Sequence, residues 1–283
     1  MTTYTTLWQR LIPAYDEGEA RAIVRLVLAD GFGLSWADVL CGKVSELSAN
    51  DRALLEKIMQ RLAGGEPVQY VLGHETFCGR TFRVAPGVLI PRPETEELCH
   101  RIVTDTQTLS RPEGERWKIL DIGTGSGCIA ATLSLDIPQA QVSAWDLSVR
   151  ALAIARENGQ SLGATVSWQE QDALNPPADT ERWDCIVSNP PYICRHEQAA
   201  MARHVLDHEP EEALFVPDDD PLRFYRAIAC YARKALRPGG RLYFEINPLH
   251  AAELEQLLHA AGFGYTAICP DSYGRQRFSL SIL

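Results

Sequence analysis

The chain has 283 residues, of which 46% are hydrophobic and 23% are charged, the ordinary balance of a soluble globular protein. This length exceeds that of a usual single domain and predicts two domains. The formal net charge of −10, from 27 basic and 37 acidic side chains, argues against a dedicated non-specific nucleic-acid binder. No apolar run approaches the roughly 18 residues that a membrane-spanning helix needs.

The cysteines and the N-terminus point to the cytoplasm. The eight cysteines are scattered, with no C-x-x-C pair and no metal-ligand spacing, so we predict a reduced protein without a metal site. The N-terminal Met-Thr-Thr-Tyr-Thr-Thr lacks the charged start and apolar core of a signal peptide. We therefore expect a cytoplasmic protein with no membrane partner.

The first part of the chain has a helical pattern. Apolar residues recur at helical spacing from Thr5 to about Arg61, and a Gly-Gly-Glu-Pro turn ends the pattern. We predict a helical bundle over residues 1–66, and a bundle of this size beside a catalytic domain is more often a substrate-docking module or a lid than a second enzyme. Val68 to Val84 alternates, which predicts a β-hairpin within a linker at residues 67–88.

Residues 89–283 alternate strands and helices. Strands are expected at 118–121, 141–145, 164–168, 183–187, 241–246, 264–269 and 278–283, and helices from 128, at 149–160, at 221–236 and at 249–261. The alternation predicts an α/β fold, a doubly wound, seven-stranded, mostly parallel Rossmann-like sheet. The small helical bundle and the β-hairpin linker precede it.

The most specific motif follows the strand at 183–187. Asn189-Pro190-Pro191-Tyr192 ends that strand because neither proline has an N–H to donate, and both residues that precede a proline are held in extended geometry. The motif then faces the C-terminal edge of the sheet, where open α/β sheets bind ligands. Asn189 Oδ1 and the Pro190 carbonyl are converging acceptors that grip an –NH2 group through both hydrogens, and Tyr192 offers a flat face to a planar amide or base. A simple turn explains Asn-Pro alone better than it explains the whole motif.

A glycine-rich loop follows the first strand, and its sequence is Asp121-Ile-Gly123-Thr124-Gly125-Ser126-Gly127. A dinucleotide binder has G-x-G-x-x-G, whereas the third glycine here comes one residue early. Asp121 would repel a pyrophosphate and suits the ammonium and sulfonium of S-adenosylmethionine. Asp146, at the end of the second strand, is placed to accept hydrogen bonds from both ribose hydroxyls, and Asp172 can reach the adenine amino group. These residues predict S-adenosylmethionine as cofactor and disfavour an NAD(P) dehydrogenase.

The two motifs resemble class I S-adenosylmethionine-dependent methyltransferases that modify adenine, guanine or glutamine nitrogens. A third motif, Ile90-Pro-Arg-Pro-Glu-Thr-Glu96, is typical of fewer methyltransferases. It resembles the HemK/PrmC-type family, the release factor glutamine N5-methyltransferases. The resemblance covers essentially the whole chain, including the helical N-terminal domain. It implies an enzyme that methylates the side-chain amide nitrogen (N5) of the glutamine in the Gly-Gly-Gln motif of peptide-chain release factors. It also implies a monomer with no stable nucleic-acid partner.

The resemblance implies the following site residues. Those at the cofactor are Asp121, Gly123, Thr124, Gly125, Ser126, Gly127, Asp146, Asp172, Ala173 and Asn189. Those at the substrate are Asn189, Pro190, Pro191, Tyr192, Arg92 and Thr95, with Asn189, Pro190 and Tyr192 as the catalytic group.

Two alternatives stay open. One is an N-methyltransferase acting on an exocyclic amine of RNA or DNA, because adenine and a glutamine amide present similar –NH2 groups. The other is a non-catalytic S-adenosylmethionine-binding module, which has no need for the acceptor pair at Asn189 and Pro190.

Overall fold

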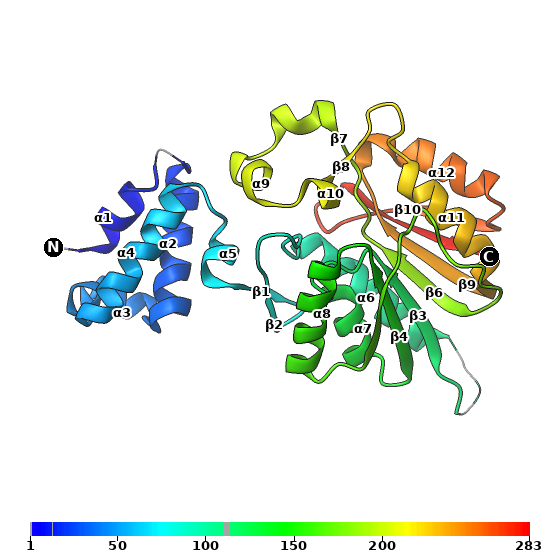
Figure 1. The fold of residues 1–283 in the computed structure, drawn as a ribbon, viewed down its shortest axis with the longest axis horizontal. Helices are drawn as coiled ribbons and strands as arrows, with labels where there is room; N and C mark the ends of the chain where they lie inside the picture. The colour runs from blue at the N-terminus through cyan, green and yellow to red at the C-terminus, as the bar shows by residue number, and fades with distance from the viewer. Residues whose placement is uncertain (1, 13, 110–111, 113) are drawn as a thin grey trace. The chain divides into compact units, whose positions relative to one another are not determined.

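The computed structural model describes residues 2–12, 14–109, 112 and 114–283. The chain divides into two compact units. The helical unit comprises Met1–His74 and Met201–His208, and the sheet unit comprises Glu75–Ala200 and Glu209–Leu283. Figure 1 shows the N-terminal helices of the first unit in blue and cyan and its helix at Arg203–His208 in yellow-green, and it shows the sheet of the second unit in colours from green to red. Among the described residues, no helix has the length and apolar character that crossing a membrane requires.

The helical unit is built from short amphipathic helices with side-chain caps. Its elements are α1 (Tyr4–Gln9), α2 (Glu17–Phe32), α3 (Trp36–Leu40), η1 (Lys43–Glu46), α4 (Ala49–Ala63), α5 (Val68–Leu72) and α9 (Arg203–His208). Asp16, Ser35 and Ser48 cap α2, α3 and α4 by accepting backbone N–H groups. The apolar faces of α1 to α5 meet in one core, in which Val24 and Met59 are fully buried.

One element of the linker differs from the sequence prediction. The hairpin forms between β1 (His74–Phe77) and β2 (Arg80–Arg83), but Val68–Leu72 is the helix α5. Pro67 at its N-cap and Gly73 at its C-cap, with φ 83°, supply helix-end signals that override the strand preference of the valines.

The predicted seven-stranded sheet is confirmed. Its spatial order is β10 (Tyr265–Pro270), β11 (Gln276–Ile282), β9 (Leu236–Glu245), β6 (Trp183–Ser188), β3 (Trp117–Ile122), β4 (Ala140–Asp146) and β5 (Val166–Glu170). Strands β9, β6, β3, β4 and β5 pair in parallel, and β11 is antiparallel to both of its neighbours. The chain order reverses between β3 and β6, and the crevice at such a reversal is where doubly wound sheets bind ligands.

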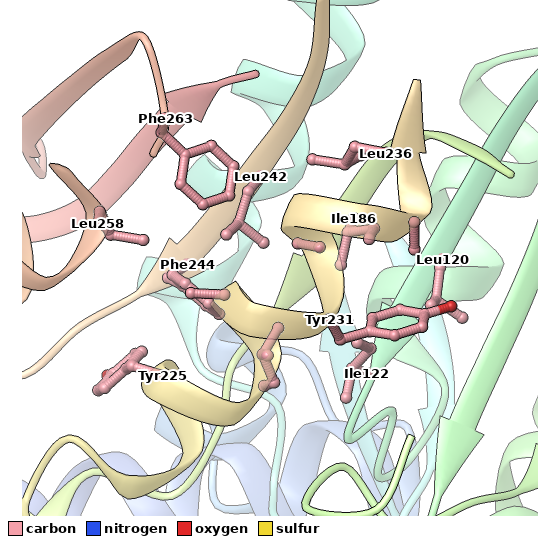
Figure 2. Packing of buried hydrophobic residues seen from close by; sticks show 14 of the residues in the cluster. Leu120, Ile122, Ile186, Tyr225, Tyr231, Leu236, Leu242, Phe244, Leu258 and Phe263 are labelled. Atoms are coloured by element: carbon pink, nitrogen blue, oxygen red, sulfur yellow. The ribbon is translucent and has the colours of Figure 1, made fainter. Parts of the chain in front are cut away.

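Helices cover both faces of this sheet. One face carries α6 (Pro93–Thr108), α7 (Cys128–Asp136) and α8 (Val149–Leu162), and the other carries α11 (Arg223–Ala235) and α12 (Ala251–Ala260). Successive residues of β6 alternate between the two cores: Cys185 and Val187 face α7, whereas Ile186 faces α11. Figure 2 shows this second core, with Leu242 and Phe244 of β9 directed toward the helices.

Short elements occupy the segment between Tyr192 and α11. They are β7 (Ile193–Cys194), η2 (Arg195–Ala200), α10 (Glu211–Leu214) and β8 (Phe215–Val216), and η3 (Pro248–His250) follows β9. Glu197 binds this segment to the sheet, because its carboxylate accepts from the Cys194 N–H at 2.8 Å and from Asn247 Nδ2 at 3.1 Å. Asn247 also donates to the Tyr192 carbonyl at 3.1 Å. These hydrogen bonds fix the segment that follows the Asn-Pro-Pro-Tyr motif against the residues that follow β9.

Candidate active site

A cavity of about 390 Å³ lies at the C-terminal edge of the parallel strands, within the size range of small-molecule sites. It brings together most of the predicted residues. Those that line it are Arg92, Thr95, Gly123, Thr124, Gly125, Ser126, Asp146, Asp172, Ala173, Asn189, Pro190 and Pro191. Three predicted residues, Asp121, Gly127 and Tyr192, do not line this cavity.

The glycine loop turns sharply between β3 and α7. Gly123, Gly125 and Gly127 all have positive φ, at 75°, 55° and 81°, a region that other residues rarely adopt. Gly127 has a second reason to be glycine, because a Cβ there would lie 2.9 Å from the Trp168 ring and 3.0 Å from the Ala155 Cβ. Gly127 therefore permits close packing behind the loop, while Gly123 and Gly125 shape its pocket side.

Two carboxylates at neighbouring strand ends face the cavity. Asp146 accepts backbone N–H groups from Gly125 and Ser148, both at 2.8 Å. Burial raises the pKa of Asp146, and these two hydrogen bonds oppose the rise. Asp172 accepts from the Leu174 N–H at 2.8 Å and from Asn175 Nδ2 at 2.6 Å. Because a carboxylate offers about four acceptor positions, both groups keep capacity for ligand hydroxyl or amino groups.

Asp121 is fully buried beneath the glycine loop. Its Oδ2 accepts the Thr124 hydroxyl at 2.6 Å, and its Oδ1 has no hydrogen-bond partner among the described residues. Burial raises the pKa of Asp121 to about 7, with a smaller contribution from the charge of Asp146. Asp121 thus supports the loop through Thr124, and its contact with the cofactor stays a prediction.

Asn189 is held at the cavity by Thr95 of α6. Its Nδ2 donates to the Thr95 hydroxyl oxygen at 3.3 Å, so its Oδ1 is the amide atom left for a ligand. In the described part of the chain, no donor bonds to Asn189 Oδ1 or to the Pro190 carbonyl. The site therefore offers the two unused acceptors that the motif predicts. Tyr192 instead directs its hydroxyl to Glu245, at 3.1 Å.

Comparison with known proteins identifies the chain. Residues 6–73 match the model of the PrmC N-terminal domain, and residues 105–215 match that of the methyltransferase small domain. The release factor glutamine methyltransferase of Bacteroides thetaiotaomicron is 46% identical over 270 residues, which are 95% of each chain. That of Flavobacterium psychrophilum is 37% identical over 96% of this chain and 95% of its own. The chain belongs to the release factor glutamine methyltransferase family.

It is accordingly an S-adenosylmethionine-dependent methyltransferase. Among solved structures, a 16S rRNA N2 G1207 methyltransferase of T. thermophilus in complex with AdoMet and guanosine shares the fold, with a TM-score of 0.50 and 20% identity. The match covers 74% of this chain and 49% of that one. This likeness confirms the predicted fold. The predicted cofactor is confirmed by the methyltransferase domain and the family of the chain.

The residues at the cavity fit this cofactor. Asp146 and Asp172 supply acceptors at two strand ends, and the apolar side chains of Ile129, Phe224 and Ile228 also line the cavity. The glycine loop leaves room for close backbone approach. Which side chain meets which part of the cofactor remains a prediction from the sequence.

Two buried glutamates at this site were not assigned roles from the sequence. Glu209, with a side chain 1% exposed, accepts from Arg92 at 2.5 Å and from the Ile90 N–H at 3.2 Å. Glu245, 2% exposed, accepts from Thr95 and Tyr192. Glu245 lies at the end of an apolar strand, whose pattern predicts only packing in the core. A single acidic residue at the end of such an apolar run could have indicated a functional role, because burying a charge is costly.

Proposed function

We propose that the enzyme transfers a methyl group from S-adenosylmethionine to the side-chain amide nitrogen (N5) of the glutamine in the Gly-Gly-Gln motif of peptide-chain release factors. Its relatives carry the name release factor glutamine methyltransferase. Release factors are the partners that this function requires.

The observation that carries the proposal is the unused acceptor pair at the cavity. Asn189 Oδ1 and the Pro190 carbonyl match the two hydrogens of a primary amide, and the Asn189 side-chain NH2 already donates to the Thr95 hydroxyl oxygen. A hydroxyl or a thiol has one hydrogen and would leave one of the two acceptors unsatisfied, which costs binding energy.

These acceptors also do the chemical work that an amide needs. An amide nitrogen is a poor nucleophile because its lone pair is delocalised into its carbonyl. By accepting both N–H hydrogens, Asn189 and Pro190 favour a pyramidal nitrogen whose lone pair faces the methyl carbon about 3 Å away. They also stabilise the positive charge that develops on that nitrogen.

The bound cofactor supplies an activated methyl group on a sulfonium. Methyl transfer would form a bond between the amide nitrogen and the methyl carbon while the carbon–sulfur bond breaks, and the electron pair would stay on sulfur in S-adenosylhomocysteine. The nitrogen then loses one proton, for which water is the proposed acceptor because none of the described residues that line the cavity is a histidine.

The test is methylation with radiolabelled S-adenosylmethionine and three acceptors: a recombinant release factor, its Gly-Gly-Gln→Gly-Gly-Ala variant, and bulk ribosomal RNA. Label on the wild-type factor alone supports glutamine methylation. Label on RNA alone would overturn the proposal in favour of an exocyclic-amine methyltransferase. Label on both the wild-type factor and its Gly-Gly-Ala variant would mean that a residue other than this glutamine is modified.

A further inference from the structure

Glu245 is buried, and burying an ionisable group costs free energy. It ends β9, and because side chains alternate along a strand it faces away from Phe244, which points into the core shown in Figure 2. Its side chain is therefore on the α6 side of the sheet, where Thr95 donates to Oε2 at 2.6 Å. Tyr192 donates to Oε1 at 3.1 Å, so each carboxylate oxygen holds one residue of the predicted substrate site.

The contacts around Glu245 explain how the charge is tolerated. Burial raises the pKa of Glu245 above its ordinary value. The hydrogen bonds from Thr95 and Tyr192 and the nearby Arg277 charge limit this rise, and the like charge of Glu94 adds to it. The Tyr225 hydroxyl donates to the Glu245 backbone carbonyl at 3.0 Å, which fixes the strand end against α11. The carboxylate is thus rigidly placed on regular elements.

The directions of the hydrogen bonds then follow from the carboxylate. A carboxylate has no hydrogen to give, so the single hydroxyl hydrogen of Thr95 is committed to Glu245. The Thr95 oxygen can consequently only accept a further hydrogen bond. The Asn189 carboxamide meets that oxygen with Nδ2, at 3.3 Å, and must turn Oδ1 toward the cavity.

We propose that Glu245 is a positioning residue that, through the Thr95 hydroxyl, holds the Asn189 carboxamide with its oxygen toward the substrate –NH2. This inference rests on the proposed function for its catalytic consequence. With the opposite orientation, Asn189 would present an N–H to a substrate N–H, and the acceptor pair would be lost.

Glu245→Gln separates this role from mere packing, because glutamine has the same shape. Its side-chain NH2 can donate to the Thr95 oxygen, which frees the Thr95 hydrogen to bond Asn189 Oδ1 and stabilises the reversed carboxamide. Thr95→Val removes the hydroxyl from the same chain of hydrogen bonds at nearly constant volume, and Thr95→Ser keeps it.

The first experiment measures single-turnover methyl transfer to the release factor and the cofactor Kd. We expect E245Q and T95V to slow transfer on the order of a hundredfold, as misorientation of a catalytic group does in other enzymes, with the cofactor Kd changed less than about threefold. T95S should recover most of the rate that T95V loses. The matched control is Thr266→Val, which removes another buried hydroxyl hydrogen bond, to Ser281 at 2.9 Å, from the far edge of the same sheet. It should transfer methyl groups like the wild type.

The second experiment needs no substrate and so stands apart from the proposed function. Protein labelled with 15N-asparagine has five side-chain amides, and Asn189→Asp identifies the signal of residue 189. Hydrogen exchange of that NH2 should be at least about tenfold faster in E245Q and T95V than in the wild type and T266V, because Nδ2 no longer donates to Thr95.

Unchanged exchange in both E245Q and T95V would overturn the proposal, as would transfer in E245Q within about twofold of the wild type. Equal losses in T95S and T95V would also overturn it, since the hydroxyl would then not matter. If E245Q does not fold, the T95V and T95S pair decides the question. If the wild type labels no release factor, the proposed function fails, and the exchange measurement still decides the orientation of Asn189.

Discussion

The two sides of the cavity are built by different means. On the cofactor side, which we define by the predicted cofactor residues, Asp146 and Asp172 bind backbone N–H groups no more than 21 residues away along the chain. On the substrate side, which we define as Arg92, Thr95, Asn189, Glu209 and Glu245, the hydrogen bonds join residues 94 to 150 positions apart. The cofactor side is therefore a set of local turns, whereas the substrate side exists only when distant segments have assembled. Changes on the first should alter cofactor binding, and changes on the second should alter turnover or stability.

The largest effect is expected for Asn189→Ala. It removes one of the two acceptors that position the substrate nitrogen and stabilise its developing charge, so kcat should fall on the order of a thousandfold. The cofactor Kd should stay within a few-fold, because Asp146, Asp172 and the glycine loop are unchanged. Steady-state kinetics with a release factor, together with calorimetric titration of S-adenosylmethionine, check both numbers. A large loss of cofactor affinity would erase the distinction between the two sides.

Asp146→Ala should show the reverse pattern. It removes a charged acceptor from the cofactor side and releases the Gly125 N–H, and losing hydrogen bonds to a charged group costs about 1.5–3 kcal/mol. The cofactor Kd should therefore rise about 10- to 100-fold, while kcat at saturating cofactor changes much less. Calorimetric titration measures this, with Glu170→Ala as control, since Glu170 is an exposed residue at the end of the neighbouring strand. An equal loss in the control would contradict the assignment.

Glu209→Gln tests the long-range construction of the substrate side. Glu209 is buried and supports both Arg92 and the Ile90 N–H, so its loss leaves a poorly paired guanidinium. Because Arg92 is partly exposed, we expect a loss of about 2 kcal/mol in the free energy of unfolding, less than for a fully buried ion pair. Glu211→Gln is the matched control two residues away: its pair with Arg195 is more than half exposed and should contribute less than about 1 kcal/mol. Urea unfolding of both variants measures the difference, and equal effects would refute the role of burial.

The same contrast explains what could be predicted from the sequence. The glycine loop, Asp146, Asp172 and Asn189-Pro-Pro-Tyr each lie at a strand end that hydrophobic periodicity locates, so their shared edge followed from strand order. The bonds from Thr95 to Glu245 and from Arg92 to Glu209 could not be predicted, because nothing local pairs residues more than 100 positions apart. The helix α5 was not predicted, and the reason is local. Its valines favour a strand, but Pro67 and Gly73 at its ends favour a helix.

The smallest effect is expected for Asp121, on the pH dependence of the free energy of unfolding, and it concerns the cofactor side alone. Its carboxyl titrates near 3.8 when the chain is unfolded and at about 7 when it is buried, so between these values the folded state holds a proton that the unfolded state has released. Raising the pH removes that proton, and stability should fall with rising pH until the folded pKa is passed. From pH 6 to pH 8 the loss attributable to Asp121 is about 1.4 kcal/mol.

Urea unfolding of the wild type and Asp121→Asn at both pH values isolates this contribution, because other titrating groups cancel in the comparison. The wild type should lose about 1.4 kcal/mol more than the variant on going from pH 6 to pH 8. A parallel pH dependence in the two proteins would mean that Asp121 keeps its charge throughout, which would require a cation or a donor at its Oδ1. Repeating the measurement with saturating S-adenosylmethionine then sharpens the comparison: if the cofactor's positive charge acts on Asp121, the difference between wild type and variant should shrink, and an unchanged difference would assign Asp121 to loop support through Thr124 alone.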